Sequence, residues 1–234
     1  DASTAAPAAE TLTLDAGTGG NILFTGAAGS AGRLGAINIT NANDVTESAG
    51  VTAASLTQAA GQGTTTFNGA VNTDTATGVR LTGNKQTVNA GVTTTGNGVV
   101  TFTNAGLLTL NADIGSEGAV TQNGAGVVRI NTDRTITTTA DAVGFATDVT
   151  LAKTGGAGLL TINTTSGNSG GANITFSSKL DGSTSGAEPL TLNAGTAGNV
   201  LFTGAVGATG AGSRLGAINI TNANNVTESA GITA

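Results

Sequence analysis

Residues 35–50 read GAINITNANDVTESAG, and residues 216–231 read GAINITNANNVTESAG, with a single difference between the two phrases. The duplication extends outward on both sides, because residues 12–53 and 190–234 also match closely, apart from a short insertion at 207–213 in the second copy. Self-similarity over such a distance is typical of repeat architectures, in which stacked units bury a common core. The phrase therefore predicts a stacked fold.

Apolar and polar residues alternate within the phrase, since Ile37 and Ile39 flank Asn38. A period of two over a few residues, bounded by Gly and Asn, is typical of a half-buried β-strand. We expect Ile37, Ile39 and Val45 to face a core and residues 41–44 to form a corner. The terminal glycines of the phrase are expected to mark its two ends. Glycine and asparagine suit corners because they accept positive φ at low cost.

Shorter phrases of the same kind recur along the whole chain. A first set consists of TLDA (13–16), TVNA (87–90), TLNA (109–112), TINT (161–164) and TLNA (191–194), and a second set ends in Phe, as in ILF (22–24), VVTF (99–102), ITF (174–176) and VLF (200–202). No window has sustained helical periodicity. We therefore predict an all-β fold, a right-handed parallel β-helix (β-solenoid) with roughly 20-residue coils and nearly no α-helix. Eleven or twelve coils would span roughly 55 Å.

The domain organisation follows from the same repeats. Residues 1–180 are expected to form one long solenoid unit and residues 181–234 the start of a second copy, within a continuous β-helix over 1–234. The N-terminal segment DASTAAPAAE is not a signal peptide, so a signal for secretion would have been removed or would lie outside this chain.

Composition excludes several classes of function. The chain has no Cys and no His, which excludes disulfides, thiolate nucleophiles and the commonest general base and metal ligand. Its eight basic residues are scattered and its net charge is −6, so nucleic acid is not an expected partner. No apolar run approaches 18 residues, so membrane insertion is not expected. Charged residues make up only 9% of the chain, against about 25% in ordinary domains.

The runs GNILFTG (20–26) and GNVLFTG (198–204), the TLNA phrases and the GAINITNAN runs carry a resemblance to known proteins. They resemble the β-strand-repeat regions of giant bacterial surface proteins of the filamentous-haemagglutinin-like and autotransporter-passenger group. This resemblance covers essentially the whole chain. It implies secretion across a Gram-negative envelope, an extracellular or cell-surface location, and a structural role in adhesion, surface coating or fibre formation.

Two motifs favour catalysis in other proteins. GNSGG (167–171) fits the nucleophile pattern Gly-x-Ser-x-Gly, but a chain without His cannot build a Ser-His-Asp triad, so we interpret the motif as a corner. Asp113 and Asp133 are spaced by one coil and are the best candidate for the paired carboxylates of a glycosidase, although two solvated turn residues explain them more simply. A carbohydrate-active enzyme is thus an alternative, and we predict no catalytic residues and no enzyme.

Three further patterns have ordinary explanations. Asp44 and Glu47 lie close enough to help hold calcium, but Asn225 replaces Asp44 in the second copy and an Asx turn explains 41–44, so neither a metal nor a cofactor site is predicted. Thr-x-Thr triplets (11–13, 64–66, 73–75, 93–95, 101–103, 135–137) resemble those of ice-binding β-solenoids, a second alternative, yet they share no coil period. Asn-x-Thr sequons begin at Asn38, Asn163, Asn173, Asn219 and Asn225, and we do not expect their use in a bacterium.

The matched ends of the chain favour a structural function. The last coils repeat the first, and no capping helix is predicted at either end, although open strand edges invite pairing unless they are capped. We therefore expect this chain to be a repeat segment of a surface fibre or adhesin. Its expected partners are copies of itself or adjacent repeats stacked end to end, with host or surface glycans as a further candidate.

Overall fold

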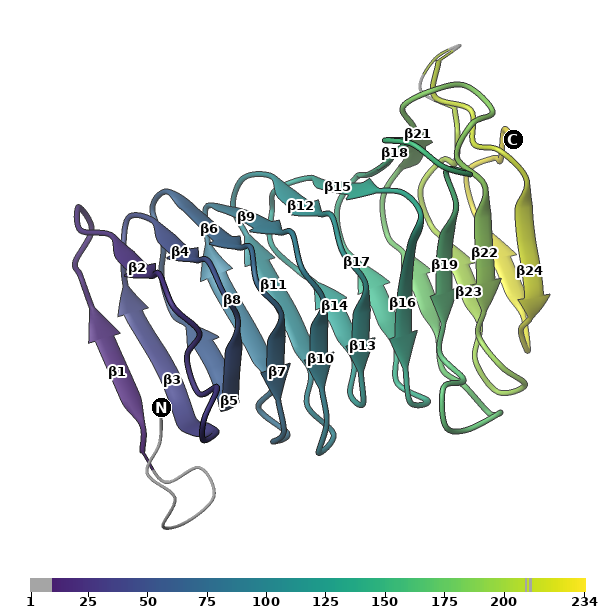
Figure 1. Ribbon diagram of the computed structural model, residues 1–234. Helices are drawn as coiled ribbons and strands as arrows, with labels where there is room; N and C mark the ends of the chain where they lie inside the picture. The colour runs from purple at the N-terminus through teal and green to yellow at the C-terminus, as the bar shows by residue number, and fades with distance from the viewer. Residues whose placement is uncertain (1–9, 209, 211) are drawn as a thin grey trace.

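The computed structural model describes residues 10–208, 210 and 212–234, in which the chain winds into a right-handed parallel β-helix (Figure 1). No helix occurs among these residues, and all strand-to-strand pairing in the ladders between named strands is parallel. The predicted fold class is therefore confirmed. The first nine residues of the DASTAAPAAE segment lie outside the described residues.

Each coil places short strands on three sides of the helix, which we number in chain order. Side 1 holds β1 (Leu12–Asp15), β3 (Leu34–Asn41), the second half of β5 (Val51–Gln58), β8 (Val79–Gly83), β11 (Val100–Asn104), β14 (Val120–Gln122), β17 (Val143–Phe145), β20 (Ile174–Phe176), β23 (Val200–Phe202) and β25 (Val226–Glu228). Side 2 holds β2 (Ile22–Phe24), β4 (Val45–Glu47), β6 (Thr64–Phe67), β9 (Lys85–Val88), β12 (Leu108–Leu110), β15 (Val128–Asn131), β18 (Val149–Ala152) and β21 (Leu180–Gly182). Side 3 holds the first half of β5, β7 (Val71–Thr73), β10 (Val92–Thr94), β13 (Ile114–Ser116), β16 (Arg134–Thr138), β19 (Leu160–Asn163), β22 (Leu190–Asn193) and β24 (Ile218–Asn222).

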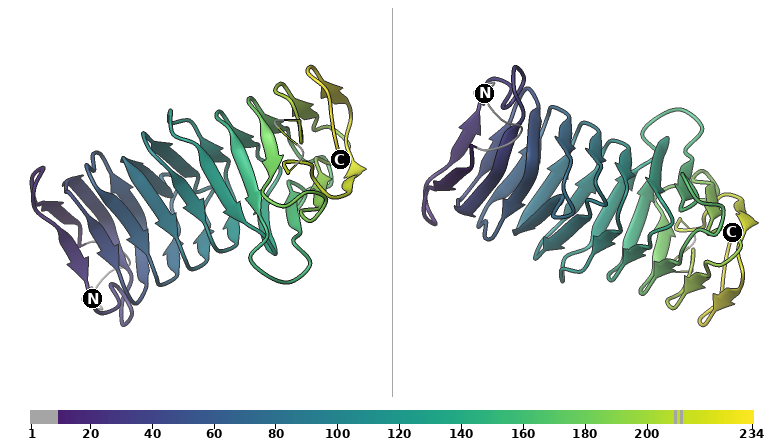
Figure 2. Two further views of the ribbon diagram at one scale, coloured as in Figure 1. Left: turned by 90° about the horizontal axis from the view of Figure 1, so that it is seen from above. Right: turned by 90° about the horizontal axis from the view of Figure 1, so that it is seen from below.

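The coils are longer in the C-terminal part than the sequence predicts. Val100 pairs with Val120, a step of 20 residues, whereas Phe145 pairs with Phe176, a step of 31 residues. The extra residues of this coil lie in longer corner loops at 153–159, after β18, and at 164–173, after β19 (Figures 1 and 2). The described residues therefore make about ten coils rather than eleven or twelve, and at about 4.8 Å per coil their stacked strands span about 43 Å.

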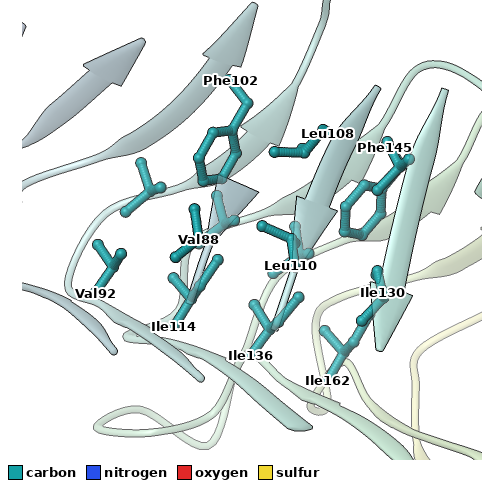
Figure 3. Packing of buried hydrophobic residues seen from close by; sticks show 14 of the residues in the cluster. Val88, Val92, Phe102, Leu108, Leu110, Ile114, Ile130, Ile136, Phe145 and Ile162 are labelled. Atoms are coloured by element: carbon teal, nitrogen blue, oxygen red, sulfur yellow. The ribbon is translucent and has the colours of Figure 1, made fainter. Parts of the chain in front are cut away.

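Inward-facing residues stack on equivalent residues of the next coil and fill a narrow core. On side 3, Ile114 pairs with Ile136 and Ile136 pairs with Ile162, and Figure 3 shows these three side chains in one row. In the first copy of the phrase, Ile37, Ile39 and Val45 are buried as predicted. Because the core is one side chain deep from each side, each coil depends on its neighbours for burial.

Aromatic stacking reinforces side 1 in the C-terminal half. The rings of Phe145 and Phe176 lie 5.5 Å apart and those of Phe176 and Phe202 lie 5.6 Å apart, both nearly parallel. Each of the three residues ends a strand on side 1, and successive ones pair in the ladder. Stacked rings at this separation add stability beyond their buried area.

The two copies of the repeated sequence occupy different sides of the helix. The first copy places β1 on side 1, paired with β3, whereas the second places the matching strand β22 on side 3, paired with β24. Strand β20 is the eighth strand on side 1, and β22 follows it by two sides. One repeat therefore advances seven coils and two further sides, so it does not contain a whole number of turns.

Candidate functional site

A buried carboxylate joins two coils at the end of β4. Glu47 is 1% exposed, and its Oε1 accepts hydrogen bonds from the backbone N–H groups of Ala49, at 2.6 Å, and Gly50. Its Oε2 accepts a third bond at 2.9 Å from the N–H of Gly69, which belongs to the next coil. Gly50 has φ 117°, so this tight turn favours glycine. The repeated phrase thus ends in a carboxylate lock that fastens one coil to the next.

The equivalent residue of the second copy forms only half of this lock. Glu228 Oε1 accepts bonds from the N–H groups of Ala230, at 2.5 Å, and Gly231, as in the first copy. Glu228 is exposed, because among the described residues its strand β25 is paired on one edge only, with β23. The local turn is therefore encoded by the phrase itself, whereas the bond to the next coil requires a neighbour.

The corner at 41–44 uses the second carboxylate of the phrase in the same structural way. Asp44 Oδ1 accepts a bond at 2.8 Å from the N–H of Thr64 in the next coil, and Oδ2 accepts one at 3.1 Å from the Asn43 side chain. The carboxylates of Asp44 and Glu47 thus both accept hydrogen bonds from other groups of the same chain. Among residues 10–208, 210 and 212–234, no group of three or more acidic side chains is placed to hold a metal ion.

Asp113 and Asp133 lie at the same corner, between sides 2 and 3, in successive coils. Asp113 Oδ1 accepts a bond at 2.8 Å from the N–H of Thr135, and Asp133 Oδ1 accepts one at 3.3 Å from the N–H of Leu159. Each carboxylate caps the backbone of the following coil. Their places at one corner of successive coils match the predicted one-coil spacing, and their contacts are those of turn residues.

Asp148 caps the next coil in the same manner. Its Oδ1 accepts bonds from the Ser178 hydroxyl and, at 3.2 Å, from the N–H of Lys179. The Ser178 bond is the main cause that lowers the pKa of Asp148 below its ordinary value, opposed by partial burial. Five acidic residues thus serve one purpose, which is to bind the backbone of the next coil: Asp44, Glu47, Asp113, Asp133 and Asp148.

GNSGG (167–171) forms a corner between β19 and β20, as predicted. The side chain of Asn168 accepts a bond at 2.9 Å from the N–H of Gly170, which closes an Asx turn. Gly171 has φ 63°, and a side chain there would collide with the backbone of Ala194. The motif is thus a turn whose last glycine, Gly171, is required by geometry.

The remaining motifs are distributed around the helix. The Thr-x-Thr triplets fall on all three sides, for example 64–66 on side 2, 93–95 on side 3 and 101–103 on side 1. The sequon asparagines lie in strands or at their ends: Asn38 in β3, Asn163 in β19, Asn173 before β20, Asn219 in β24 and Asn225 before β25. A shallow depression of about 440 Å³ lies at the corner between sides 1 and 2, lined mostly by small residues such as Ala60, Gly83 and Ala105.

Sequence reasoning missed the polar ladders inside the corners. The Gln122 side chain is buried, donates to Asn104 Oδ1 at 2.8 Å, and accepts from the N–H of Ala146 at 3.1 Å. Thr94 and Ser116 form a buried hydroxyl pair at 2.9 Å. The signal was present, because a polar residue ends many three-residue strands whose first residue is apolar and faces inward. Exposed and half-buried asparagines form a further ladder along the corner between sides 2 and 3: Asn68, Asn89, Asn111 and Asn131.

At the two ends of the described helix, inward-facing apolar residues are only partly buried. Leu12, Leu14, Ile22 and Phe24 are only partly buried, whereas their second-copy equivalents on β22 and β23 are fully buried between neighbouring coils. At the other end, Val226 is 51% exposed, whereas its twin Val45 is 1% exposed. The same sequence is therefore core in one copy and surface in the other.

Comparison of the chain with protein-family models, curated proteins and solved structures found no match. In the part of the chain that the structure describes, no helix is long and apolar enough to cross a bilayer. The resemblance to filamentous-haemagglutinin-like repeats accordingly stays a prediction.

Proposed function

We propose that this chain is a structural segment of an elongated shaft, part of a secreted fibre or adhesin on a bacterial surface. The observation that supports it most directly is that the acidic corner residues Asp44, Glu47, Asp113, Asp133 and Asp148 bind the backbone of the next coil. Polar groups that could perform chemistry elsewhere are here used to hold coils in register. The surface location is supported by the resemblance of the repeats alone.

A tandem chain tests the shaft. If residues 12–189 are repeated in one polypeptide, each added unit should extend the helix by seven coils and two sides, or about 37 Å at about 4.8 Å per coil. Small-angle scattering should show the maximum dimension rising linearly with the number of units. Separate beads joined by flexible connections, or a compact particle, would overturn the proposal.

Location is tested independently on cells. Antibodies raised against the chain should label intact cells that carry the gene, on projections outside the envelope. Labelling that requires permeabilised cells would contradict a surface fibre. A carbohydrate-active enzyme is tested by polysaccharide turnover with the wild-type chain and with Asp113→Asn, since turnover lost in that variant would replace the structural proposal.

A further inference from the structure

The strands at the outer edge of the C-terminal coil have twins in the first copy. In the first copy, the strands that pair with these twins are part of the same chain. There, β3, β4 and Val51 are paired on their outer edges with β5, β6 and Val71. In the second copy, β24, β25 and Ile232 pair on their inner edges with β22, β23 and Val206. Within the described residues no strand covers their outer edges. The first copy therefore shows which kind of coil fits there.

The N-terminal coil of the chain has the pattern of the coil that covers the first copy. The covering coil, residues 56–71, reads LTQAAGQGTTTFNGAV, and the N-terminal coil, residues 12–28, reads LTLDAGTGGNILFTGAA. Both begin with Leu-Thr, have Ala-Gly before the side 2 strand, and end with Phe-x-Gly-Ala and one further apolar residue, and they differ in length by one residue. A second copy of the chain thus carries a matching cover at its own N-terminal end.

The carboxylate lock shows how the match works at one position. Glu47 pairs in the ladder with Phe24 on one side and with Phe67 on the other. Glu228 pairs with Phe202 on its inner side. If residues 12–28 of a second copy cover this coil as residues 56–71 cover the first, Phe24 of that copy takes the place of Phe67.

The hydrogen bonds of the lock are matched as well. Gly69 lies two residues after Phe67 and donates its N–H to Glu47 Oε2. Gly26 lies two residues after Phe24, so in a second copy it supplies the same donor to Glu228. The lock that is half formed in the isolated chain is thereby completed.

The single difference between the two phrases fits the same contact. Asp44 Oδ1 accepts a bond from the N–H of Thr64. Asn225 keeps an oxygen acceptor at that position, and Asn21 of a second copy stands where Thr64 stands in the covering coil. The change from Asp to Asn removes a charge and preserves the acceptor that a stacked coil requires.

We infer that the outer edge of residues 218–232 binds the N-terminal coil, residues 12–28, of a second copy of this chain, head to tail. The inference rests on the proposed shaft function and names its partner. Strand β1 of the second copy lies on β24, β2 lies on β25, and the helix continues without a break in winding. Such a contact is heterologous and does not close, so it propagates into a filament.

One internal contact has no counterpart at this junction. In the first copy, Arg33 forms an ion pair of 3.0 Å with Asp74 and donates to the Asn72 side chain at 2.6 Å. Its twin Arg214 finds no carboxylate in residues 28–31 of a second copy, which read AGSA. The junction is therefore weaker than an internal coil contact, and assembly depends on protein concentration.

Sedimentation velocity on the full chain, from micromolar to millimolar concentration, measures assembly, and electron microscopy shows the particle shape. We expect monomers to convert to rods that lengthen in steps of one chain. Glu228→Gln keeps one oxygen for the local turn and loses the acceptor for Gly26, so association should weaken roughly tenfold or more. The matched control Glu117→Gln alters a half-buried carboxylate in a middle coil and should leave association unchanged.

Mixing two blocked chains tests the polarity of the contact. Val226→Lys blocks the C-terminal edge and Ile22→Lys blocks the N-terminal coil, with Gly26→Pro as a second N-terminal variant should Ile22→Lys disturb the first coil. Each variant alone should stay monomeric, and an equimolar mixture should give dimers only. Self-association of either variant alone would overturn head-to-tail stacking. A wild-type chain that stays monomeric at all concentrations would also overturn it. The shaft proposal would still stand in that case if the tandem chain of repeated units formed a linear rod.

Discussion

Replacing Glu47 and Glu228 separately by alanine compares one residue in two structural contexts. Their local sequences are the same, VTESAG in both copies, so local propensity cancels between the two variants. Glu47 is buried and binds three backbone N–H groups, whereas Glu228 is exposed and binds two. Any difference in stability therefore measures the effect of stacking on the carboxylate.

The magnitude follows from the donors that lose their acceptor. In Glu47→Ala, the N–H of exposed Ala49 can turn to water, while those of half-buried Gly50 and Gly69 are left without a partner. A fully buried donor without an acceptor costs about 1–3 kcal/mol, and because these two donors are only half-buried we expect their combined loss in the lower part of the range, about 2–4 kcal/mol in the free energy of unfolding. Glu228→Ala frees only donors that water reaches, and we expect a change within about 0.5 kcal/mol.

Urea denaturation followed by circular dichroism measures both variants, at a concentration where the chain is monomeric. Hydrogen exchange adds local resolution, because Glu47→Ala should accelerate exchange at Gly50 and at Gly69 of the neighbouring coil. Equal losses in the two variants would refute the reasoning, since the lock would then be a purely local turn. A Glu47→Ala chain as stable as wild type, with unchanged exchange at Gly69, would refute it as well.

Three further outcomes are expected. Ile39→Asp buries a charge in a thin core and should cost several kcal/mol, whereas Ile220→Asp, at the partly exposed twin position, should cost much less in the same urea assay. Phe176→Ala removes the middle ring of the aromatic stack and should lower the free energy of unfolding by about 3–5 kcal/mol. The Ser178 hydrogen bond lowers the pKa of Asp148, so this carboxylate stabilises the fold above its unfolded pKa of about 3.9, and the stabilisation is lost as pH falls through the lower folded pKa. The difference in urea midpoint between wild type and Asp148→Asn should accordingly shrink as pH falls from neutral to below about 4, and a difference that grows in acid would contradict this.

Local patterning was sufficient to predict the fold class and the inward residues. Alternation around Asn38 assigned Ile37 and Ile39 to the core, and the structure buries both. Coil number was overestimated because Gly-rich and Ser-rich stretches such as 164–173 carry no period, so their length could not be assigned to a corner or to a strand. The role of Glu47 could not be predicted either, because a charged residue three positions before Gly50 indicates a surface turn until the next coil is known to lie above it.

The side on which each strand lies was also beyond sequence reasoning, for a physical reason. All three sides accept the same inward pattern of an apolar residue, an outward residue and a second inward residue, as in β4, β13 and β23. A phrase that fits one side therefore fits another, and the structure uses this freedom by placing ILF (22–24) on side 2 and VLF (200–202) on side 1.

Because the three sides are equivalent, the repeat changes the side of the shaft on which a given outward residue lies. Because one unit advances seven coils and two of three sides, the outward Thr13 of β1 and its counterpart Thr191 of β22 lie on different sides of the shaft. If further units followed the same winding, an outward residue would return to its starting side only after three units. A shaft built in this way presents each surface feature in three directions, without any change in sequence, and its core is insensitive to the rotation because every side packs alike.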